Sequence, residues 1–299
     1  MFSLSTLLHL RIPFSYFLMP VYFFALGNSP NFNESRIVIS FLAIHLLLYP
    51  ASNGYNSYFD KDDKSIGGLK DPPPVRQGLY FAALLMDVMA VLLGLQVSIL
   101  FATMLFIYGM ASKAYSHPSV RLKKHPVGGW LVTGFFQGFF AFLMGYEGIN
   151  SLGLNGFLKP NILIPAALSS VMLMGSYPMT QIYQHEEDER HGDKTISMVM
   201  GVRGTFLLTA VLFVLASSGF FVFFEICFNT KYAILFLAFL SPALVYFLVW
   251  FWKVNSDGSL ANYGWAMWLN FISATCLNGF FIYFFLDHSQ VLQAVEGGY

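Results

Sequence analysis

Long apolar runs recur along the whole chain and restrict its fold more than any other feature. The 299 residues are 56% hydrophobic and only 11% charged, whereas soluble domains are about 25% charged. A membrane-spanning helix needs about 20 apolar residues. The runs therefore predict an all-α integral membrane protein with nine transmembrane helices. The predicted spans are Ile12–Leu26, Ile37–Tyr58, Leu79–Leu95, Val97–Ala114, Gly128–Tyr146, Ile162–Tyr183, Thr205–Cys227, Tyr232–Trp252 and Gly264–Leu286.

The basic residues are divided unevenly between the two ends of these spans. All but three of the 16 Lys and Arg residues fall on the side that holds the N-terminus; the exceptions are Arg36, Lys159 and Lys231. Loops that remain in the cytoplasm carry an excess of Lys and Arg. We therefore expect the N-terminus to be cytoplasmic and the C-terminus to lie outside.

Two Asp-rich loops interrupt the apolar runs on this cytoplasmic side. The first covers residues 53–77 and the second residues 184–203, each after an even-numbered span. Because the loops lie four spans apart, they suggest a four-helix unit that occurs twice in the same orientation. We expect residues 1–299 to form a single transmembrane domain.

The first loop places oxygen ligands at helical spacing. We expect the second span to continue one or two turns beyond Tyr58. Asn56 and Asp60 would then share one face, because residues four apart are neighbours on a helix. Asp63 or Lys64 would follow on the same face.

The second loop repeats part of this arrangement. Gln184 and Asp188 are four residues apart, and we expect Gly192 to interrupt the helix so that Asp193 turns back towards Asp188. Clustered carboxylate and amide oxygens suit Mg²⁺, which usually binds through one or two carboxylates plus substrate phosphates. The two loops therefore predict a magnesium site.

Basic residues accompany the acidic ones. The segment from Lys113 to Lys124 contains four bases and no acid. A basin with metal ions on one side and Arg and Lys on the other is the arrangement that phosphoryl-bearing substrates require. The predicted ligand is therefore a polyanion held by metal.

Taken as a set, the motifs resemble those of the UbiA superfamily of intramembrane prenyltransferases, and the resemblance covers essentially the whole chain. The motifs are Asn56-x-x-x-Asp60-x-x-Asp63, Asp188-x-x-x-x-Asp193 and, between them, Tyr115-Ser116-x-Pro118-x-x-Arg121-Leu122-Lys123. The resemblance implies nine helices in a ring around a central cavity. It also implies Mg²⁺-dependent transfer of an isoprenyl group from a prenyl diphosphate to a lipophilic acceptor, aromatic or otherwise, within the lipid bilayer, and no role for nucleic acid.

The resemblance also implies roles for individual residues. The expected metal ligands are Asn56, Asp60, Asp63, Asp188 and Asp193, with help from Glu187. The expected diphosphate clamp is Arg121 and Lys123, with Lys194 as a further candidate. Catalysis would depend on Asp60, Asp188, Arg121 and Lys123. Tyr58, Tyr115 and Tyr183 are candidates for orienting the substrate, although an interfacial aromatic belt accounts for them equally well.

Two departures from the family pattern leave other functions open. Ser57 and Lys64 stand where the family has acidic residues. A catalytically silent relative that binds prenyl lipids is therefore the first alternative, and a transporter is the second. Acceptor identity, prenyl chain length and ring closure without an acceptor are not fixed by the sequence.

Three further acids fall near or within spans. Asp87 lies inside the third span, where an ionisable residue is either functional or a paired structural group. Glu147 and Glu225 lie at predicted external helix ends, where we expect ordinary solvated carboxylates.

Overall fold

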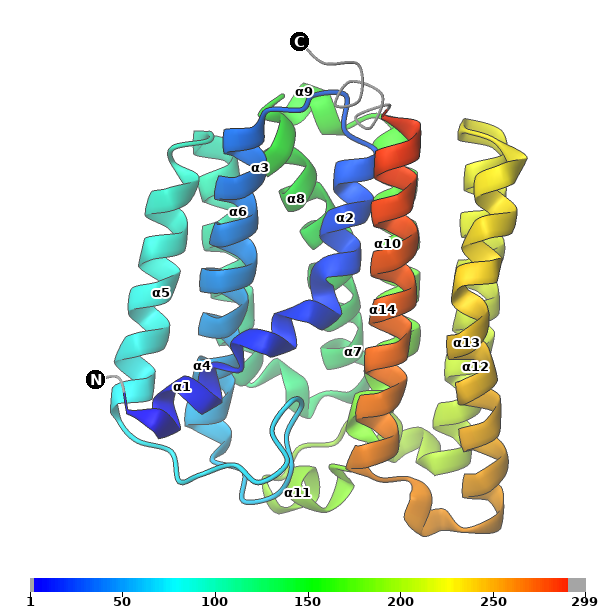
Figure 1. The fold of residues 1–299 in the computed structure, drawn as a ribbon. Coiled ribbons are helices and arrows are strands. Elements are labelled where there is room, and N and C mark those ends of the chain that lie inside the picture. The colour runs from blue at the N-terminus through cyan, green and yellow to red at the C-terminus, as the bar shows by residue number, and fades with distance from the viewer. Residues whose placement is uncertain (1–2, 290–299) are drawn as a thin grey trace.

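The computed structural model describes residues 3–289 as a bundle of long helices (Figure 1). Within these residues, eight helical segments are long and apolar enough to cross a membrane. They are Leu4–Gly27, Glu34–Asp60, Ile99–Ser116, Pro126–Asn150, Pro160–Gln181, Ile196–Cys227, Thr230–Ser256 and Tyr263–His288, and α5 (Gly78–Gly94) is a shorter apolar helix. Together they occupy the nine predicted spans. The expected position of the C-terminus falls on residues 290–299, which lie outside the described residues.

The first span is broken into three pieces and begins earlier than predicted. It consists of α1 (Leu4–Leu10), the 3₁₀ segment η1 (Ile12–Leu18) and α2 (Met19–Gly27). The break occurs at Arg11, whose φ of 47° is left-handed. Because of this break, α1 lies across the lower end of the bundle at a steep angle to the long helices (Figure 1).

Two other spans contain π-helical turns in their middle. In the second span, η2 (Leu42–Leu48) joins α3 (Glu34–Phe41) to α4 (Tyr49–Asp60). In the fifth, η4 (Phe135–Phe140) joins α7 (Pro126–Gly134) to α8 (Ala141–Asn150). Turns of this kind occur frequently at functional sites. Helix α4, which follows η2, and helix α7, which precedes η4, both border the cavity at the lower end of the bundle.

The remaining long helices are regular apart from one kink. They are α6 (Ile99–Ser116), α10 (Pro160–Gln181), α12 (Ile196–Cys227), α13 (Thr230–Ser256) and α14 (Tyr263–His288). The kink lies at Gly201 in α12, where φ is 65°. The junction between the third and fourth spans is sharp, because the Ser98 hydroxyl accepts the Phe101 amide at 2.9 Å and starts α6.

The short elements divide between the two ends of the bundle. The first Asp-rich loop and α11 (His185–Arg190) lie at the lower end, while α9 (Leu154–Phe157) lies at the upper end (Figure 1). Aromatic side chains fill the upper half: Phe24, Phe142, Phe220 and Phe281 are all fully buried. The rings of Phe24 and Phe281 stack at 4.6 Å. The polar loops therefore lie at the lower end of the bundle, and aromatic side chains pack its upper half.

Glu147 differs from its prediction as a solvated carboxylate. Its side chain is buried and accepts hydrogen bonds from the Ser98 hydroxyl at 2.9 Å and from the amides of Leu152 and Gly153 at 3.1 and 3.0 Å. Because a buried carboxylate is stable only when its oxygens are hydrogen-bonded, Glu147 serves to fix the turn after α8.

Asp87 has a partner on the neighbouring helix. Its carboxylate pairs with the ammonium of Lys113 in α6, and that ammonium also lies 5.1 Å from the centre of the Tyr55 ring. Pairing lowers the cost of placing a charge among the membrane spans. This contact gives Asp87 a structural role between α5 and α6.

Gly138 sets the closest approach between η4 and α10. A methyl group at Gly138 would lie 2.3 Å from the Cα atom of Ser170, which is backbone and has no free rotation to relieve the clash. We expect Gly138→Ala to lower stability by about 1–3 kcal/mol because the two helices must separate. The measurement is the melting temperature of the purified protein in detergent.

Gly128→Ala is the matched control, because its methyl group would lie at an ordinary 3.4 Å from His125 Cβ. Equal melting temperatures for the two variants would show that the approach of η4 to α10 is not tight.

Candidate active site at the lower end of the bundle

A cavity of ≈ 220 Å³ lies at the end of the bundle where the two Asp-rich loops meet. One wall is a stripe along α4 formed by Ser52, Asn56 and Asp60, which recur every four residues and so share a face. The opposite wall comes from α10 and the segment that follows it, including Gln181 and Asp188. Residues from both loops therefore reach one cavity.

The first motif is held at the last turn of α4. The Asn56 side chain donates to Asp60 Oδ2 at 2.7 Å and to the Ser116 hydroxyl at 3.1 Å. Asn56 and Asp60 thus share one face, as their spacing predicts. The Asp60 side chain is only 3% exposed, so its charge is largely removed from water.

The predicted continuation of this helix is wrong. Helix α4 ends at Asp60 because Lys61 adopts a left-handed conformation with φ of 52°. Asp63 therefore leaves the helix face, is exposed, and donates its amide to Glu187 Oε1 at 3.3 Å. Its neighbour Asp62, which is not among the five expected metal ligands, lines the cavity instead.

The second motif turns back on itself as predicted. Gly192 has a φ of 71° and follows the end of α11. The Asp193 amide then donates to the carbonyl oxygen of Asp188 at 2.9 Å. Asp193 is buried, and Asp188 lines the cavity with an Oδ2 atom that accepts no hydrogen bond from the described residues.

Arg121 and Lys123 join the two motifs. Arg121 donates from Nε and Nη2 to the two carboxylate oxygens of Asp193, at 2.7 and 2.9 Å. The Lys123 ammonium lies 2.6 Å from Asp60 Oδ2 and 3.1 Å from Asp193 Oδ2. A longer contact of 3.4 Å links Arg121 Nη2 to Asp60 Oδ1. Both expected diphosphate-binding cations therefore contact expected metal ligands.

The acidic side chains around this bridge resist ionisation. Burial raises the pKa of Asp188 to about 7, and the nearby carboxylates of Asp193, Asp62 and Asp60 add to the rise, while Lys123 opposes it. Burial, followed by repulsion from Asp60, likewise raises the pKa of Asp62 to about 6. The nearby Arg and Lys side chains thus do not fully compensate for the burial and mutual repulsion of these carboxylates.

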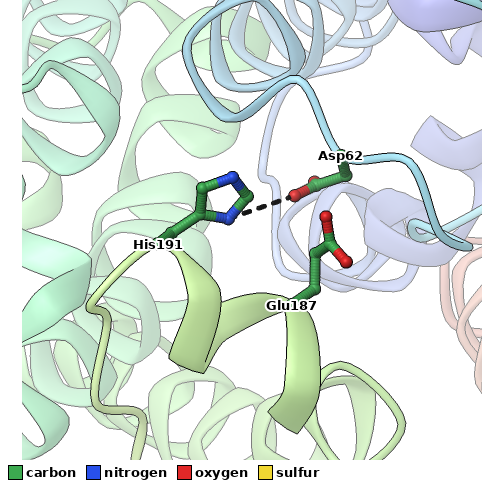
Figure 2. A group of neighbouring side chains, drawn as sticks. All are labelled: Asp62, Glu187 and His191. Carbon is green, nitrogen blue, oxygen red and sulfur yellow. Dashed lines mark ion pairs between the residues drawn. The ribbon is translucent and has the colours of Figure 1, made fainter.

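A second acidic group lies where the loops touch. Asp62, Glu187 and His191 offer ligand atoms that all lie within 4.8 Å of one another, and Figure 2 shows His191 facing Asp62. The His191 Nδ1 atom is 3.6 Å from Asp62 Oδ1. Arg190 competes for Glu187, since its Nη1 atom lies 3.2 Å from Oε2. The group links the first loop to α11, and the sequence spacing gave no sign of it.

The remaining predicted residues divide between the cavity and the surface. Tyr115 and Tyr183 line the cavity, and the Tyr115 hydroxyl bonds to that of Tyr177. Tyr58 lies outside the cavity lining and packs among neighbouring aromatic rings. Lys194 is exposed. The structure therefore brings two of the three selected tyrosines to the site.

Arg11, one of the basic residues that predict which side of the membrane is cytoplasmic, also lines the cavity. Its guanidinium donates to the carbonyl oxygens of Gly67 at 3.0 Å and Asn53 at 3.2 Å, and its side chain lines the cavity. It is 9% exposed. In the sequence, Arg11 is a single arginine between two apolar stretches. Its contribution to the charge difference between the two sides of the membrane accounts for it, so nothing marked it as a site residue.

The chemistry of the donor set fits Mg²⁺. Asn56, Asp60 and Asp188 line the cavity, and Asp193 adjoins it through its ion pairs with Arg121 and Lys123. All four offer oxygen ligands of the kind that hard divalent cations prefer. Asp188 Oδ2 and Asp60 Oδ1 are buried and accept no hydrogen bond within the part of the chain that the structure describes. A cation would satisfy these oxygens and relieve the repulsion that raises the carboxyl pKa values.

Comparison with known proteins agrees with the arrangement of these residues. The sequence model of the UbiA prenyltransferase family matches residues 17–272. The chain belongs to the UbiA prenyltransferase family. It is therefore a multi-pass integral membrane protein, and the family predicted from the two Asp-rich motifs is confirmed. No curated protein matches the chain at the level of sequence.

Solved structures share the UbiA fold with this chain. A UbiA homolog from Archaeoglobus fulgidus bound to GPP and Mg²⁺ has a TM-score of 0.67 at 18% identity, covering 94% of this chain and 99% of that one. The same homolog bound to DMAPP and Mg²⁺ has a TM-score of 0.68 at 17% identity, with the same coverage. A digeranylgeranylglyceryl phosphate synthase structure has a TM-score of 0.58 at 15% identity, covering 94% and 96%. The all-helical membrane fold is thereby confirmed.

The raised pKa of Asp188 gives a testable pH dependence. Folding favours the protonated carboxyl, since the pKa rises from 3.8 to about 7. The native state is therefore destabilised progressively as pH increases through this window, and Asp188→Asn removes the effect. In EDTA and without substrate, we expect the melting temperature of Asp188→Asn to rise progressively relative to that of the unmodified protein between about pH 4 and pH 7.

Glu189→Gln, an exposed position of the same helix, is the control and should show no such divergence. A difference between Asp188→Asn and the unmodified protein that stays constant over the pH range would contradict the prediction.

Proposed function

We propose that this protein transfers an isoprenyl group from a prenyl diphosphate to a lipophilic acceptor within the membrane, with Mg²⁺ as cofactor. The observation that supports this most strongly is the meeting of Asp60 and Asp193, from loops four spans apart, on the shared cations Arg121 and Lys123. The binding of GPP or DMAPP with Mg²⁺ by the homolog from Archaeoglobus fulgidus agrees with the proposal.

Four side chains would hold the metal. Asn56 and Asp60 come from α4, while Asp188 and Asp193 come from the second loop. Bound Mg²⁺ would supply positive charge to the diphosphate leaving group. Asp62, which lines the cavity, would join these four as a fifth ligand in place of the exposed Asp63.

Arg121 and Lys123 would stabilise the leaving group directly. Their side chains are 14% and 11% exposed, and a charge removed from water acts more strongly on a neighbouring charge. Burial alone would lower the pKa of Lys123, but the carboxylates of Asp60 and Asp193 raise it above its usual value. Lys123 therefore stays cationic at the pH of the cell. Lys194 remains a candidate for the same role.

Aromatic groups line the cavity beyond the charged residues. Phe14, Tyr115 and Tyr177 contribute to its walls. Aromatic faces attract positive charge, so these rings would shield the charge that develops on the allylic carbon as the carbon–oxygen bond breaks. The acceptor would attack that carbon and lose a proton. Tyr183 would help orient the substrate.

We also propose that the site end of the bundle faces the cytoplasm. The excess of Lys and Arg at this end supports this orientation. The two loops lie together at the lower end in Figure 1, opposite α9. A diphosphate donor would then enter from the aqueous compartment, and the acceptor from the bilayer.

The structure weakens both alternatives. Lys64, whose position favoured a silent lipid-binding relative, pairs with Glu186 on the exposed surface and so leaves Asp60 to other partners. A transporter needs a path across the membrane, whereas the aromatic core of fully buried Phe24, Phe142 and Phe281 fills the half of the bundle beyond the cavity. Both observations are compatible with the proposed prenyl transfer.

Ligand-induced stabilisation tests the proposal. A ligand that binds only the folded protein stabilises it by about 2.7 kcal/mol at a hundred times its Kd. We expect dimethylallyl diphosphate to raise the melting temperature with Mg²⁺ and to have no effect with EDTA. Asp60→Asn and Asp188→Asn should each lose this shift, because each removes a charged metal ligand. Prenyl transfer to a screened set of lipophilic acceptors should be lost in parallel.

Glu189→Gln again serves as the control, and its ligand-induced shift should equal that of the unmodified protein. A full shift in both aspartate variants would refute the metal assignment. Binding without transfer to any acceptor would favour the silent relative.

A further inference from the structure

Two aromatic side chains close the inner end of the cavity. Tyr108 is the innermost cavity residue on α6, and Phe136 lies beside Gln137 on η4, the innermost cavity positions of its span. Their rings meet edge to face at 6.2 Å. Behind Tyr108 stands the ring of Tyr49, at 5.5 Å. Tyr49 and Tyr108 are 4% and 5% exposed, so this floor is packed on its far side.

The cavity is short as well as closed. From Ser116, which hydrogen-bonds to the first motif, to Tyr108 the helix advances by about 12 Å at roughly 1.5 Å per residue. The volume of ≈ 220 Å³ is below the roughly 300–1,000 Å³ of pockets for drug-sized ligands. A diphosphate group must occupy the end near Asp60, which leaves little depth for hydrocarbon.

The region beyond the floor offers no room for a longer chain. Tyr108 belongs to the same buried cluster as Phe101, Met104 and Leu105, which continue along α6 towards the upper end. The deepest part of the cavity also carries polar groups, among them the carboxamide of Gln137. A hydrocarbon tail placed there would leave such a group without a hydrogen-bond partner, which costs free energy.

We propose that Tyr108 and Phe136 act as a chain-length stop that restricts the donor to short prenyl diphosphates. The five-carbon dimethylallyl chain is preferred, and the ten-carbon geranyl chain is the longest accepted. This inference rests on the proposed function, which places the diphosphate at the Asp-rich end, and it adds the donor class. Longer chains are excluded because inserting atoms into a packed core forces neighbouring side chains and backbone to move.

Binding by a series of donors tests this chain-length stop. The full-length protein in detergent is titrated with dimethylallyl, geranyl, farnesyl and geranylgeranyl diphosphates and with inorganic pyrophosphate, all with Mg²⁺. We expect dimethylallyl diphosphate to bind at least about tenfold more tightly than the farnesyl and geranylgeranyl donors. Tyr108→Ala and Phe136→Ala should each reduce that ratio by roughly tenfold or more. Neither should change the binding of pyrophosphate, which has no chain.

Phe139→Ala is the matched control. Phe139 is a half-buried aromatic residue on η4 that stacks on Phe135 at 5.4 Å and lies outside the cavity lining. Its loss should leave the chain-length ratio unchanged. Phe136→Leu keeps an apolar side chain and provides a second variant if an alanine substitution prevents folding; it should widen acceptance to the farnesyl donor.

The outcomes separate the two proposals. Tight binding of pyrophosphate together with equal binding of short and long donors overturns the chain-length stop and leaves the proposed function intact. The stop is equally overturned if Phe139→Ala relaxes the ratio as much as Phe136→Ala does. Failure of every diphosphate to bind, pyrophosphate included, overturns the proposed function and this inference with it.

Discussion

A bridge of four largely buried charges holds the lower end of this protein together. Asp60 and Asp193 carry the negative charges, and Arg121 and Lys123 lie between them. Each charge alone would be costly away from water, and removing one partner leaves the others uncompensated. Three segments that are distant in sequence are therefore tied to one another. The positions of the cavity-lining Asp60 and Lys123, and of the proposed metal ligand Asp193, all depend on this contact.

Much of the architecture follows from physical rules that act on single segments. The nine spans were predictable because each is an apolar run of nearly membrane length, and Ser98 marks the junction between the third and fourth spans by capping α6. The turn at Gly192 was predictable because glycine adopts positive φ at little cost. The distribution of basic residues and the pairing of the two Asp-rich loops predicted that these loops share one site, whereas the contacts that join them depend on how distant helices pack.

The errors have a common physical origin in residues that carry no local signal. Lys61 and Arg121 adopt left-handed conformations, with φ of 52° and 42°. Lysine and arginine are not among the residues that favour positive φ, so the sequence did not predict these turns. The early end of α4 moves Asp63 to the surface and brings Asp62 to the cavity. The ion pairs of Arg121 and the burial of Glu147 likewise depend on tertiary contacts that spacing along the chain does not encode.

The packed helices and the loops around the cavity are held by forces of different kinds. Buried apolar and aromatic side chains pack the helices against one another, whereas the loops are held by charged side chains and by contacts such as the hydrogen bond from the Asp63 amide to Glu187. Regions with few buried apolar contacts open locally at a lower free energy than a packed core. Backbone amides at the lower end should therefore exchange with solvent through small local openings that leave the spans folded. Entry and departure of molecules at this end need only such an opening, and the membrane-embedded scaffold stays in place throughout.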